Sequence, residues 1–209
     1  MSDTAAKQNI LILFAHPGQN HSKANLAMAK AAKQLENVTF VDLYADYPKL
    51  DINIKKEQQR LLEHDVIILQ FPIFWYSTPS MLKEWQDLVL EYGFAYGQGG
   101  NALKDKKFIL AVTAGGDQKA YSADGHNEYP LTDYLLPLKQ TAKLCHMQYL
   151  PPFVLFGSLA AQTDGSIEKH VILYQELLTA LVDNNLDYKK VTSRDFINNS
   201  PLPINGKAS

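Results

Sequence analysis

The sequence is poor in the features that mark several specialised classes of protein. It has a single cysteine, Cys145, so it forms no internal disulfide and no multi-cysteine metal site, and this usage fits a reducing compartment. The polar stretch Met1–Asn9 lacks the apolar core of a signal peptide, and no apolar run approaches the length of a membrane span. We therefore expect a cytoplasmic protein without membrane insertion.

Charge of one sign is lacking too. The formal net charge is −2, and basic and acidic residues are mixed along the chain. This balance predicts no nucleic-acid partner, because binding to a phosphate backbone depends on many lysine and arginine contacts. The 6 histidines are not spaced as a zinc cluster, so we expect no metal site.

Several motifs of nucleotide-binding and hydrolytic enzymes are also missing. No GxGxxG follows the first apolar run and no GxxxxGK[ST] occurs, which disfavours a dinucleotide-binding Rossmann domain and a P-loop NTPase. There is no GxSxG nucleophile elbow. The opening Ala15-His16-Pro17 also begins some zinc deacetylases, but Gly18 and Gln19 stand where those enzymes need an acidic pair.

Aromatic residues, in contrast, are abundant. The chain has 2 Trp, 11 Tyr and 9 Phe, and many of them fall in segments expected to be loops. Aromatic side chains in loops at strand ends favour a flat ligand.

Short, continuous apolar runs recur along the chain and predict strands. They do not alternate cleanly between apolar and polar residues, which is typical of strands buried on both faces of a parallel sheet. The runs are Ile10–Ala15, Val38–Leu43, Val66–Phe71, Phe108–Ala114 and Phe153–Gly157.

Amphipathic stretches between these runs predict helices. Thr78 and Pro79 are expected to be the N-cap and the first-turn proline of one helix, with Leu82, Trp85 and Val89 on its buried face. In a later helix Pro137 predicts a late or kinked start, and Cys145 falls on the apolar stripe, where a core position is expected.

The alternation of strands and helices predicts an α/β fold: a flavodoxin-like doubly wound five-stranded parallel sheet of order 2-1-3-4-5, with helices on both faces and right-handed crossovers. We expect one domain over residues 1–188. Residues 189–209, rich in Asn, Ser and Pro, are expected to form a loosely ordered C-terminal tail.

Ligands of such sheets bind beyond the carboxyl ends of the strands, and the loops after the first, third and fourth strands lie side by side there. In the first loop, the unpaired N–H groups at the start of a helix favour an anion, with Ser22 and Asn25 as further donors and His16 or Lys23 as positive charge. This pattern predicts phosphate binding, although Ser22 as a simple helix cap remains the alternative.

The second and third loops predict a site for a flat ring. Residues Phe71–Ser80 include four aromatics and two prolines, which form either a stacking wall or a hydrophobic plug. Adjacent glycines at Gly115-Gly116 allow the backbone to approach a ligand, although an ordinary turn remains the alternative. In the same loop His126 is a candidate acid or hydrogen-bond donor.

Taken together, these residues resemble the NAD(P)H:quinone oxidoreductase family, which covers long mammalian quinone reductases and shorter bacterial relatives, including the ancillary flavoproteins of glutathione-gated potassium efflux systems. The resemblance runs from about Ile10 to Gly157. It is carried by Ala15-His16 with Ser22 to Asn25, Asp65 to Tyr76, Pro79 to Trp85, Gly93 to Tyr96, Thr113 to Gly116, and Tyr121-Ser122.

The resemblance implies a bound flavin, a homodimer with both active sites at the subunit interface, and NAD(P)H as co-substrate. The chain lacks the long C-terminal extension of the mammalian enzymes, which favours FMN, with FAD as the alternative. The implied activity is two-electron, ping-pong hydride transfer to quinones or similar flat electrophiles. The alternative function is a regulatory, flavin-binding ancillary subunit of a glutathione-gated potassium efflux transporter; an electron-transfer flavodoxin is disfavoured because such proteins are usually more acidic.

The resemblance also assigns expected roles to residues. Tyr121 is implied as a catalytic and cofactor-binding residue, and His126 as a second catalytic candidate, with Asn127 as its alternative. Phe94 and Tyr96 are implied at the site of the partner subunit. The implied cofactor-binding residues are His16, Ser22, Lys23, Ala24, Asn25, Pro72, Ile73, Phe74, Trp75, Tyr76, Thr113, Ala114, Gly115 and Gly116.

Overall fold

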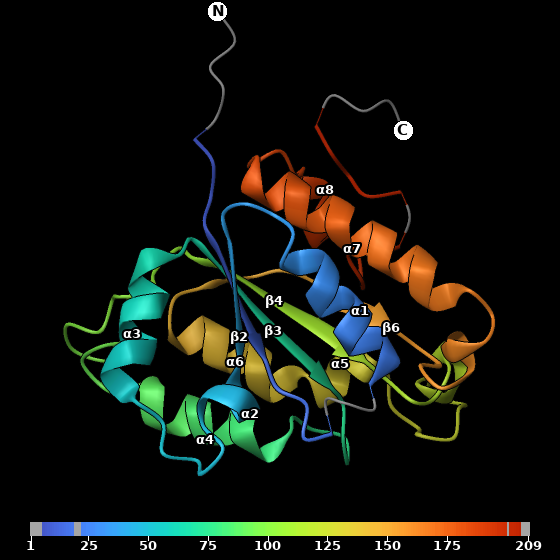
Figure 1. The fold of residues 1–209 in the computed structure, drawn as a ribbon, viewed down its shortest axis with the longest axis horizontal. Coiled ribbons are helices and arrows are strands. Elements are labelled where there is room, and N and C mark those ends of the chain that lie inside the picture. The colour runs from blue at the N-terminus through green and yellow to red at the C-terminus, as the bar shows by residue number, and fades with distance from the viewer. Residues whose placement is uncertain (1–5, 19–21, 200, 206–209) are drawn as a thin grey trace, which may run out of the picture.

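A parallel sheet forms the centre of the computed structural model, which describes residues 6–18, 22–199 and 201–205 (Figure 1). Its order is β2-β1-β3-β4-β5, with β6 also paired to β4, so the predicted fold and strand order are confirmed. The strands are β1 (Ile10–Phe14), β2 (Val38–Asp42), β3 (Val66–Pro72), β4 (Lys107–Thr113), β5 (Gln148–Tyr149) and β6 (Phe153–Leu155).

The fifth strand position is divided between two short strands, and the first of these was not predicted. β5 pairs with the start of β4, and β6 pairs with its end at Ala111 to Thr113. Pro151 and Pro152 lie between β5 and β6. Because proline has no N–H to donate to a strand ladder, the pairing is interrupted there.

Helices cover both faces of the sheet, which explains why the strands are continuously apolar. Ile10 and Ile12 pack on one face with α1 (Lys23–Ala32) and α7 (Ser166–Val182), which lie side by side in Figure 1. Leu11 and Leu13 pack on the other face, with α3 (Ile54–Glu63), α4 (Ser80–Val89) and α6 (Leu136–Leu144). The remaining helices are α2 (Leu43–Asp46), η2 (Gln118–Ala120), α5 (Leu131–Tyr134), η3 (Ala160–Gln162) and α8 (Tyr188–Thr192).

Helix α4 begins later than the sequence predicted. Pro79, with extended backbone, occupies the N-cap position and makes no side-chain cap hydrogen bond, so Thr78 is not the cap. The predicted buried face is present, since Leu82, Trp85 and Val89 are buried. The later helical segment is divided into α5 and α6, and Pro137 lies in the first turn of α6, as a late start requires.

Residues 189–199 and 201–205 of the C-terminal segment pack against the rest of the protein, although the polar composition of residues 189–209 predicted a loosely ordered tail; residues 200 and 206–209 of that prediction lie outside the described residues. Its apolar residues Val191, Phe196 and Ile197 are buried, and the Ile197 N–H donates to the Pro152 carbonyl at 3.0 Å. The Asn198 side chain holds both backbone groups of Val154, at 2.9 Å to its nitrogen and 2.8 Å to its oxygen. A few well-placed apolar side chains are therefore sufficient to dock a segment that is mostly polar.

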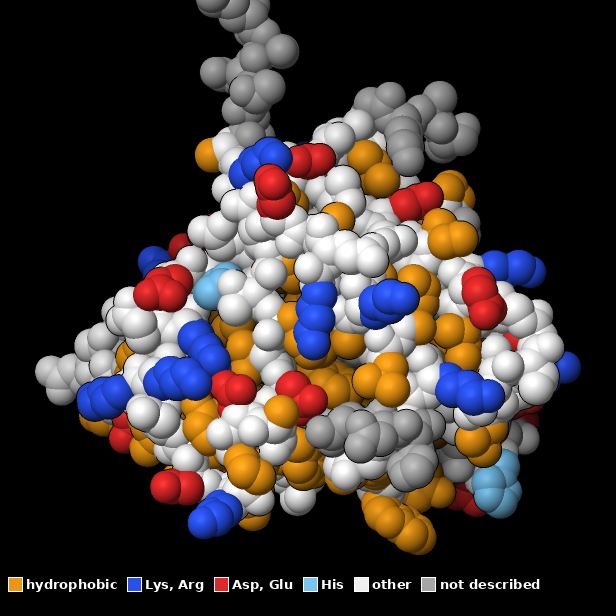
Figure 2. All heavy atoms as spheres, in the orientation of Figure 1, with side chains coloured by type: hydrophobic (Ala, Val, Ile, Leu, Met, Phe, Trp, Pro, Cys, Tyr) orange, Lys and Arg blue, Asp and Glu red, His pale blue; other side chains and the backbone are white. Residues whose placement is uncertain are grey.

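The surface carries both charge signs. On the face shown in Figure 2, lysine and arginine side chains are interspersed with aspartate and glutamate, so this face has no extended patch of one sign. Among the helices of the described residues, none is both long and apolar enough to span a bilayer. Over the same ranges, no group of three His, Cys, Asp or Glu side chains is arranged to hold a metal ion.

Candidate functional site

The three loops expected to meet at the carboxyl ends of the strands do meet, around a hollow of about 340 Å³. We call this hollow the strand-end hollow. A fourth segment, after β6, also lines it and was not predicted. The lining residues are His16, Ser22, Lys23, Ala24, Asn25, Pro72, Ile73, Phe74, Thr113, Gly115, Ser158, Leu159 and Gln162.

Helix α1 begins at the strand-end hollow, and the backbone N–H groups of Lys23 and Ala24 have no hydrogen-bond partner within residues 6–18, 22–199 and 201–205. Ser22 is its N-cap, and the Ser22 hydroxyl oxygen accepts from the Asn25 N–H at 3.3 Å. The N–H groups of Lys23 and Ala24 precede the first possible intrahelical acceptor, and the first turn holds no acidic residue. The cap and the donors therefore coexist, and the helix start favours a bound anion.

His16, which also lines the hollow, adds a hydrogen-bond donor whose atom is determined. The Gly18 N–H donates to its Nδ1 at 3.1 Å, so in the neutral ring the proton is on Nε2. Burial lowers the pKa of His16, which keeps the ring neutral at pH 7. The ring also lies edge-on to Phe74, with centroids 5.7 Å apart.

A chain of buried hydrogen bonds supports the floor of the hollow. The Asn25 Nδ2 donates to the Thr113 Oγ1 at 2.9 Å, and the Gln70 Nε2 donates to the Asn25 backbone oxygen at 3.1 Å. The Tyr174 hydroxyl, on α7, donates to the Gln70 Oε1 at 3.2 Å. All four side chains are buried, so this polar chain links α1, β3, β4 and α7 inside the protein.

The second loop ends in a strained two-residue turn. Phe74 and Ser77 exchange backbone hydrogen bonds of 3.0 Å in both directions, and the two residues between them, Trp75 and Tyr76, have φ values of 48° and 60°. This geometry normally selects Asn-Gly, because side chains with a Cβ are disfavoured in the left-handed region. Trp75 is 94% exposed and is not in the strand-end hollow, whereas Phe74 lines it.

The glycines of the third loop occupy different surroundings. A Cβ at Gly115 would meet no atom within 4 Å, and Gly115 lines the hollow. A Cβ at Gly116 would lie 3.3 Å from both Ala120 Cβ and Tyr121 Cε2. Gly115 therefore leaves space for a ligand, whereas Gly116 leaves space for the Tyr121 ring.

Tyr121 belongs to a cluster of tyrosines beside the hollow. Its ring packs on Phe156 and Tyr134, with centroids 5.8 and 6.1 Å apart, and Tyr76 stacks on Tyr134 at 5.0 Å. Burial, and then the neighbouring Tyr76 and Tyr134, raise the pKa of Tyr121. The Tyr121 hydroxyl therefore keeps its proton throughout the physiological range.

At the end of this loop the structure places Asn127, and not His126, against the tyrosine cluster. The Tyr76 hydroxyl donates to Asn127 Oδ1 at 3.3 Å, and the Tyr134 hydroxyl donates to the Asn127 carbonyl at 2.7 Å. His126 is exposed. The resemblance implied Asn127 only as the alternative to His126, because it lies two residues after Gly125; Ser158, Leu159 and Gln162 carried no sequence signal.

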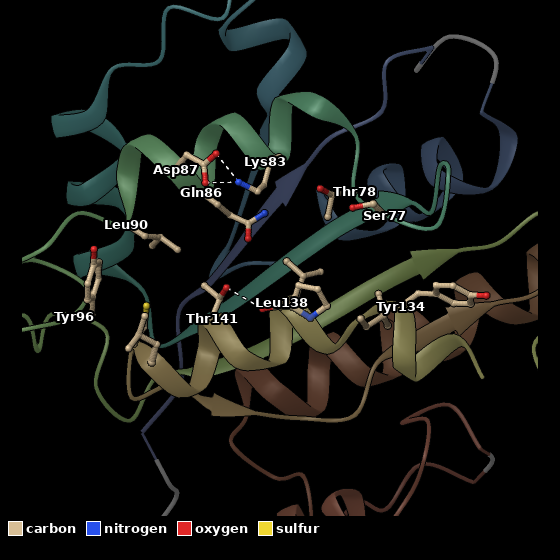
Figure 3. A pocket seen from close by; sticks show the side chains of 14 residues that line it. Ser77, Thr78, Lys83, Gln86, Asp87, Leu90, Tyr96, Tyr134, Leu138 and Thr141 are labelled. Atoms are coloured by element: carbon tan, nitrogen blue, oxygen red, sulfur yellow. Dashed lines mark hydrogen bonds and ion pairs between the residues drawn. The ribbon is translucent and has the colours of Figure 1, made fainter. Parts of the chain in front are cut away.

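Phe94 and Tyr96 lie outside the strand-end hollow. Tyr96 lines a second groove of about 360 Å³ between α4 and α6. Figure 3 shows Tyr96 at one end of this groove, with Ser77, Thr78 and Tyr134 toward the other. Phe94 is partly buried against the core.

Comparison with known proteins agrees with this geometry. The family model for the flavodoxin-like fold matches residues 8–178. The glutathione-regulated potassium-efflux system ancillary protein KefG of Serratia proteamaculans is 44% identical over 169 residues, which cover 81% of this chain and 92% of the relative.

Two solved structures are similar along nearly their whole length. General stress protein 14 from Treponema denticola, in complex with FMN, aligns with a TM-score of 0.78 and 38% identity over 83% of this chain and 99% of that one. An NADPH-quinone reductase from P. pentosaceus aligns with a TM-score of 0.72 and 29% identity over 81% and 96%. By sequence and by fold, the chain therefore belongs to the flavodoxin-like family that includes these proteins, which confirms the resemblance stated above.

Proposed function

We propose that this chain is a flavin-dependent oxidoreductase that takes hydride from NAD(P)H and reduces quinones or similar flat electrophiles, with FMN as its cofactor. The observation that carries the proposal is that three features meet at one hollow. They are the start of helix α1, which favours an anion, the buried Thr113 hydroxyl, and Gly115, where a Cβ would meet no atom within 4 Å. A relative with 38% identity has a structure in complex with FMN.

The residues of the hollow suit the chemical groups of FMN. The N–H groups of Lys23 and Ala24, with the His16 Nε2–H, are donors for a phosphate. Thr113 offers a hydroxyl for a polar edge, and Gly115 permits close approach of a ring. Phe74 supplies an apolar wall.

A bound flavin would supply the acceptance and donation of hydride, and the protein residues would bind, orient and stabilise charge. The role that we give Tyr121 is that of a hydrogen-bond donor, since its raised pKa keeps the hydroxyl protonated. Such a donor stabilises negative charge that develops during hydride transfer. Asn127, held by Tyr76 and Tyr134, is a second polar group on the same side.

The proposal includes a homodimer. Phe94 and Tyr96 do not reach the strand-end hollow of their own chain, and the exposed Tyr92 lies edge-on to Tyr96 with centroids 5.8 Å apart. In a second copy of the chain, Tyr96 would complete the active site from across the interface, as the family resemblance implies.

An absorption spectrum of the purified protein, before and after anaerobic NADPH, tests the activity. We expect a flavin spectrum that bleaches on NADPH and recovers when a quinone is added, with FMN released on denaturation. A colourless protein that also fails to take up added FMN would refute the proposal.

The similarity to ancillary protein KefG supports a second candidate, a subunit that docks on a potassium-efflux transporter. Potassium efflux from vesicles that contain the transporter, measured with and without the purified protein, tests this function. Activation by the wild type and by Tyr121→Phe alike would favour regulation independent of turnover, and no activation by either would exclude it.

A further inference from the structure

We propose that Tyr174 and Gln70 are positioning residues for the flavin: through Asn25 they force the Thr113 hydroxyl to donate its proton into the strand-end hollow. Neither residue lines the hollow, and Tyr174 lies on α7, which contributes no residue to its lining. This inference rests on the proposed function, because it concerns how the hollow recognises FMN.

The direction of the hydrogen bonds in this buried series is fixed at the Asn25 backbone oxygen. This atom is an acceptor only, so the group of Gln70 that lies 3.1 Å from it must be the Nε2 amide. The Gln70 Oε1 therefore points the other way, where it accepts from the Tyr174 hydroxyl at 3.2 Å. The orientation of Gln70 is thus set by the Asn25 carbonyl, and the Tyr174 hydroxyl stabilises it by donating to the Oε1.

Gln70 in turn orients the side chain of Asn25. The Gln70 Nε2 also lies 3.4 Å from the Asn25 Oδ1, so this oxygen faces a donor and the Asn25 Nδ2 is turned toward Thr113. If the Asn25 amide were reversed, its Nδ2 would face the Gln70 Nε2, and two N–H donors would meet in the protein interior, which is strongly unfavourable.

The last link determines what Thr113 can do. Its Oγ1 accepts from the Asn25 Nδ2 at 2.9 Å, so its own hydroxyl hydrogen must go to another acceptor. No such acceptor occurs among residues 6–18, 22–199 and 201–205, and Thr113 lines the hollow. The hydroxyl is therefore a donor matched to an acceptor oxygen of the bound flavin.

The substitution Tyr174→Phe tests the inference with little loss of packing, because the ring contact with Phe153, at 5.2 Å between centroids, is kept. Without the hydroxyl, the buried Gln70 Oε1 loses its hydrogen-bond donor, and Gln70 is held by its Nε2 contacts alone. We expect the Kd for FMN, measured by quenching of flavin fluorescence, to rise about threefold to tenfold, the effect of one hydrogen bond. Tyr188→Phe is the matched control, since its hydroxyl donates to Asn184 Oδ1 at 3.3 Å away from the hollow, and its Kd should not change.

A double-mutant cycle separates positioning from a merely structural role. If Tyr174 acts through Thr113, adding Tyr174→Phe to Thr113→Val should weaken FMN binding no further, whereas independent effects would multiply. Thr113→Ser keeps the hydroxyl and should restore the sensitivity to Tyr174→Phe. The melting temperature of the apoprotein, measured for every variant, reports the structural effect separately.

The outcomes distinguish this inference from the proposed function. If the wild type binds no FMN, both fail. If the wild type binds FMN and Tyr174→Phe binds it equally well, or if the cycle is simply multiplicative, only the positioning role is wrong. Riboflavin, which lacks the phosphate, serves as the second probe: equal weakening of both flavins places the acceptor on the part they share, and weakening of FMN alone places it on the phosphate.

Discussion

The imidazole of His170 lies against the ring of Phe153, with centroids 4.4 Å apart, and its Nε2 is buried without a hydrogen-bond partner in the described part of the chain. Burial lowers the pKa of His170 to about 4, from 6.5 in an unfolded chain. Between these two values the unfolded state binds more protons than the folded state, so this histidine destabilises the fold as the pH falls.

We expect His170 to lower the free energy of unfolding by about 2 kcal/mol between pH 7 and pH 5, with no effect above pH 7. The substitution His170→Leu removes the titrating group and the unpaired nitrogen, so urea unfolding should show a stability that declines less over this range. Equal slopes for the wild type and the variant would show that His170 does not titrate between those limits.

The two glycines of the third loop should respond differently to the same substitution. Gly115→Val has room in the protein, so its free energy of unfolding should change by less than about 0.5 kcal/mol, while FMN binding is lost because the side chain fills the hollow. Gly116→Val must displace the Tyr121 ring, so stability should fall by about 1–3 kcal/mol. Urea unfolding and FMN titration of both variants check this, and a Gly115→Val protein with full FMN binding would contradict the site.

Tyr121→Phe should slow flavin reduction by NADPH about tenfold, the effect of one hydrogen bond to developing charge, while FMN stays bound. Because the pKa of Tyr121 is raised, the wild-type contribution of this hydroxyl should not vary between pH 6 and pH 9. Stopped-flow reduction across this range provides the measurement. An unchanged rate in the variant would remove Tyr121 from the mechanism.

The left-handed conformation of Trp75 should lower the free energy of unfolding. Trp75→Gly relieves a left-handed conformation at a side chain that is 94% exposed, so the free energy of unfolding should rise by about 1 kcal/mol. Trp75→Ala keeps the disfavoured φ and should give no such gain. If the exposed indole contacts a substrate or a partner subunit, quinone turnover should fall in both variants; a turn that serves only the fold would leave turnover unchanged.

A buried carboxylate holds helices α2 to α4 together. Glu57 is fully buried and accepts from the Tyr47 hydroxyl at 2.6 Å, from Trp85 Nε1 at 3.0 Å and from Arg60 at 2.5 Å. Glu57→Gln removes a charge from this network and should lower the free energy of unfolding by about 2–3 kcal/mol.

Asp87→Asn is its matched control, since Asp87 makes an exposed pair with Lys83 and should change stability by less than about 1 kcal/mol. Urea unfolding of the two variants gives the comparison. Similar losses in both would mean that burial does not strengthen the Glu57 network.

Much of this fold could be predicted because its strands are buried on both faces. The runs that became β1, β3 and β4 are apolar at nearly every buried position, with Gln70 and Thr113 as the polar exceptions, and this pattern is typical of strands covered on both faces. β5 was missed because Gln148–Tyr149 is too short to leave a periodic signal. The C-terminal segment was misjudged because its average composition hides the few side chains that dock it.

The candidate site was predictable at the level of loops but not of side chains. Strand order places the three loops together, whatever their sequence. The choice between His126 and Asn127 depended on how one long loop folds back on Ala120, and the role of the segment after β6 depended on the break at Pro151 and Pro152. Neither is encoded in a local motif.

The pair of hydrogen bonds between Asn198 and Val154 has a further consequence for behaviour in concentrated solution. Strand β6 is an edge strand of the sheet, and the unpaired backbone groups of an exposed edge strand can pair with a strand of another chain. One asparagine amide occupies the donor and the acceptor that such a strand would use. We therefore expect the segment around Asn198 to protect this edge against strand addition, and a form truncated before it to lose this protection while it keeps every residue of the hollow.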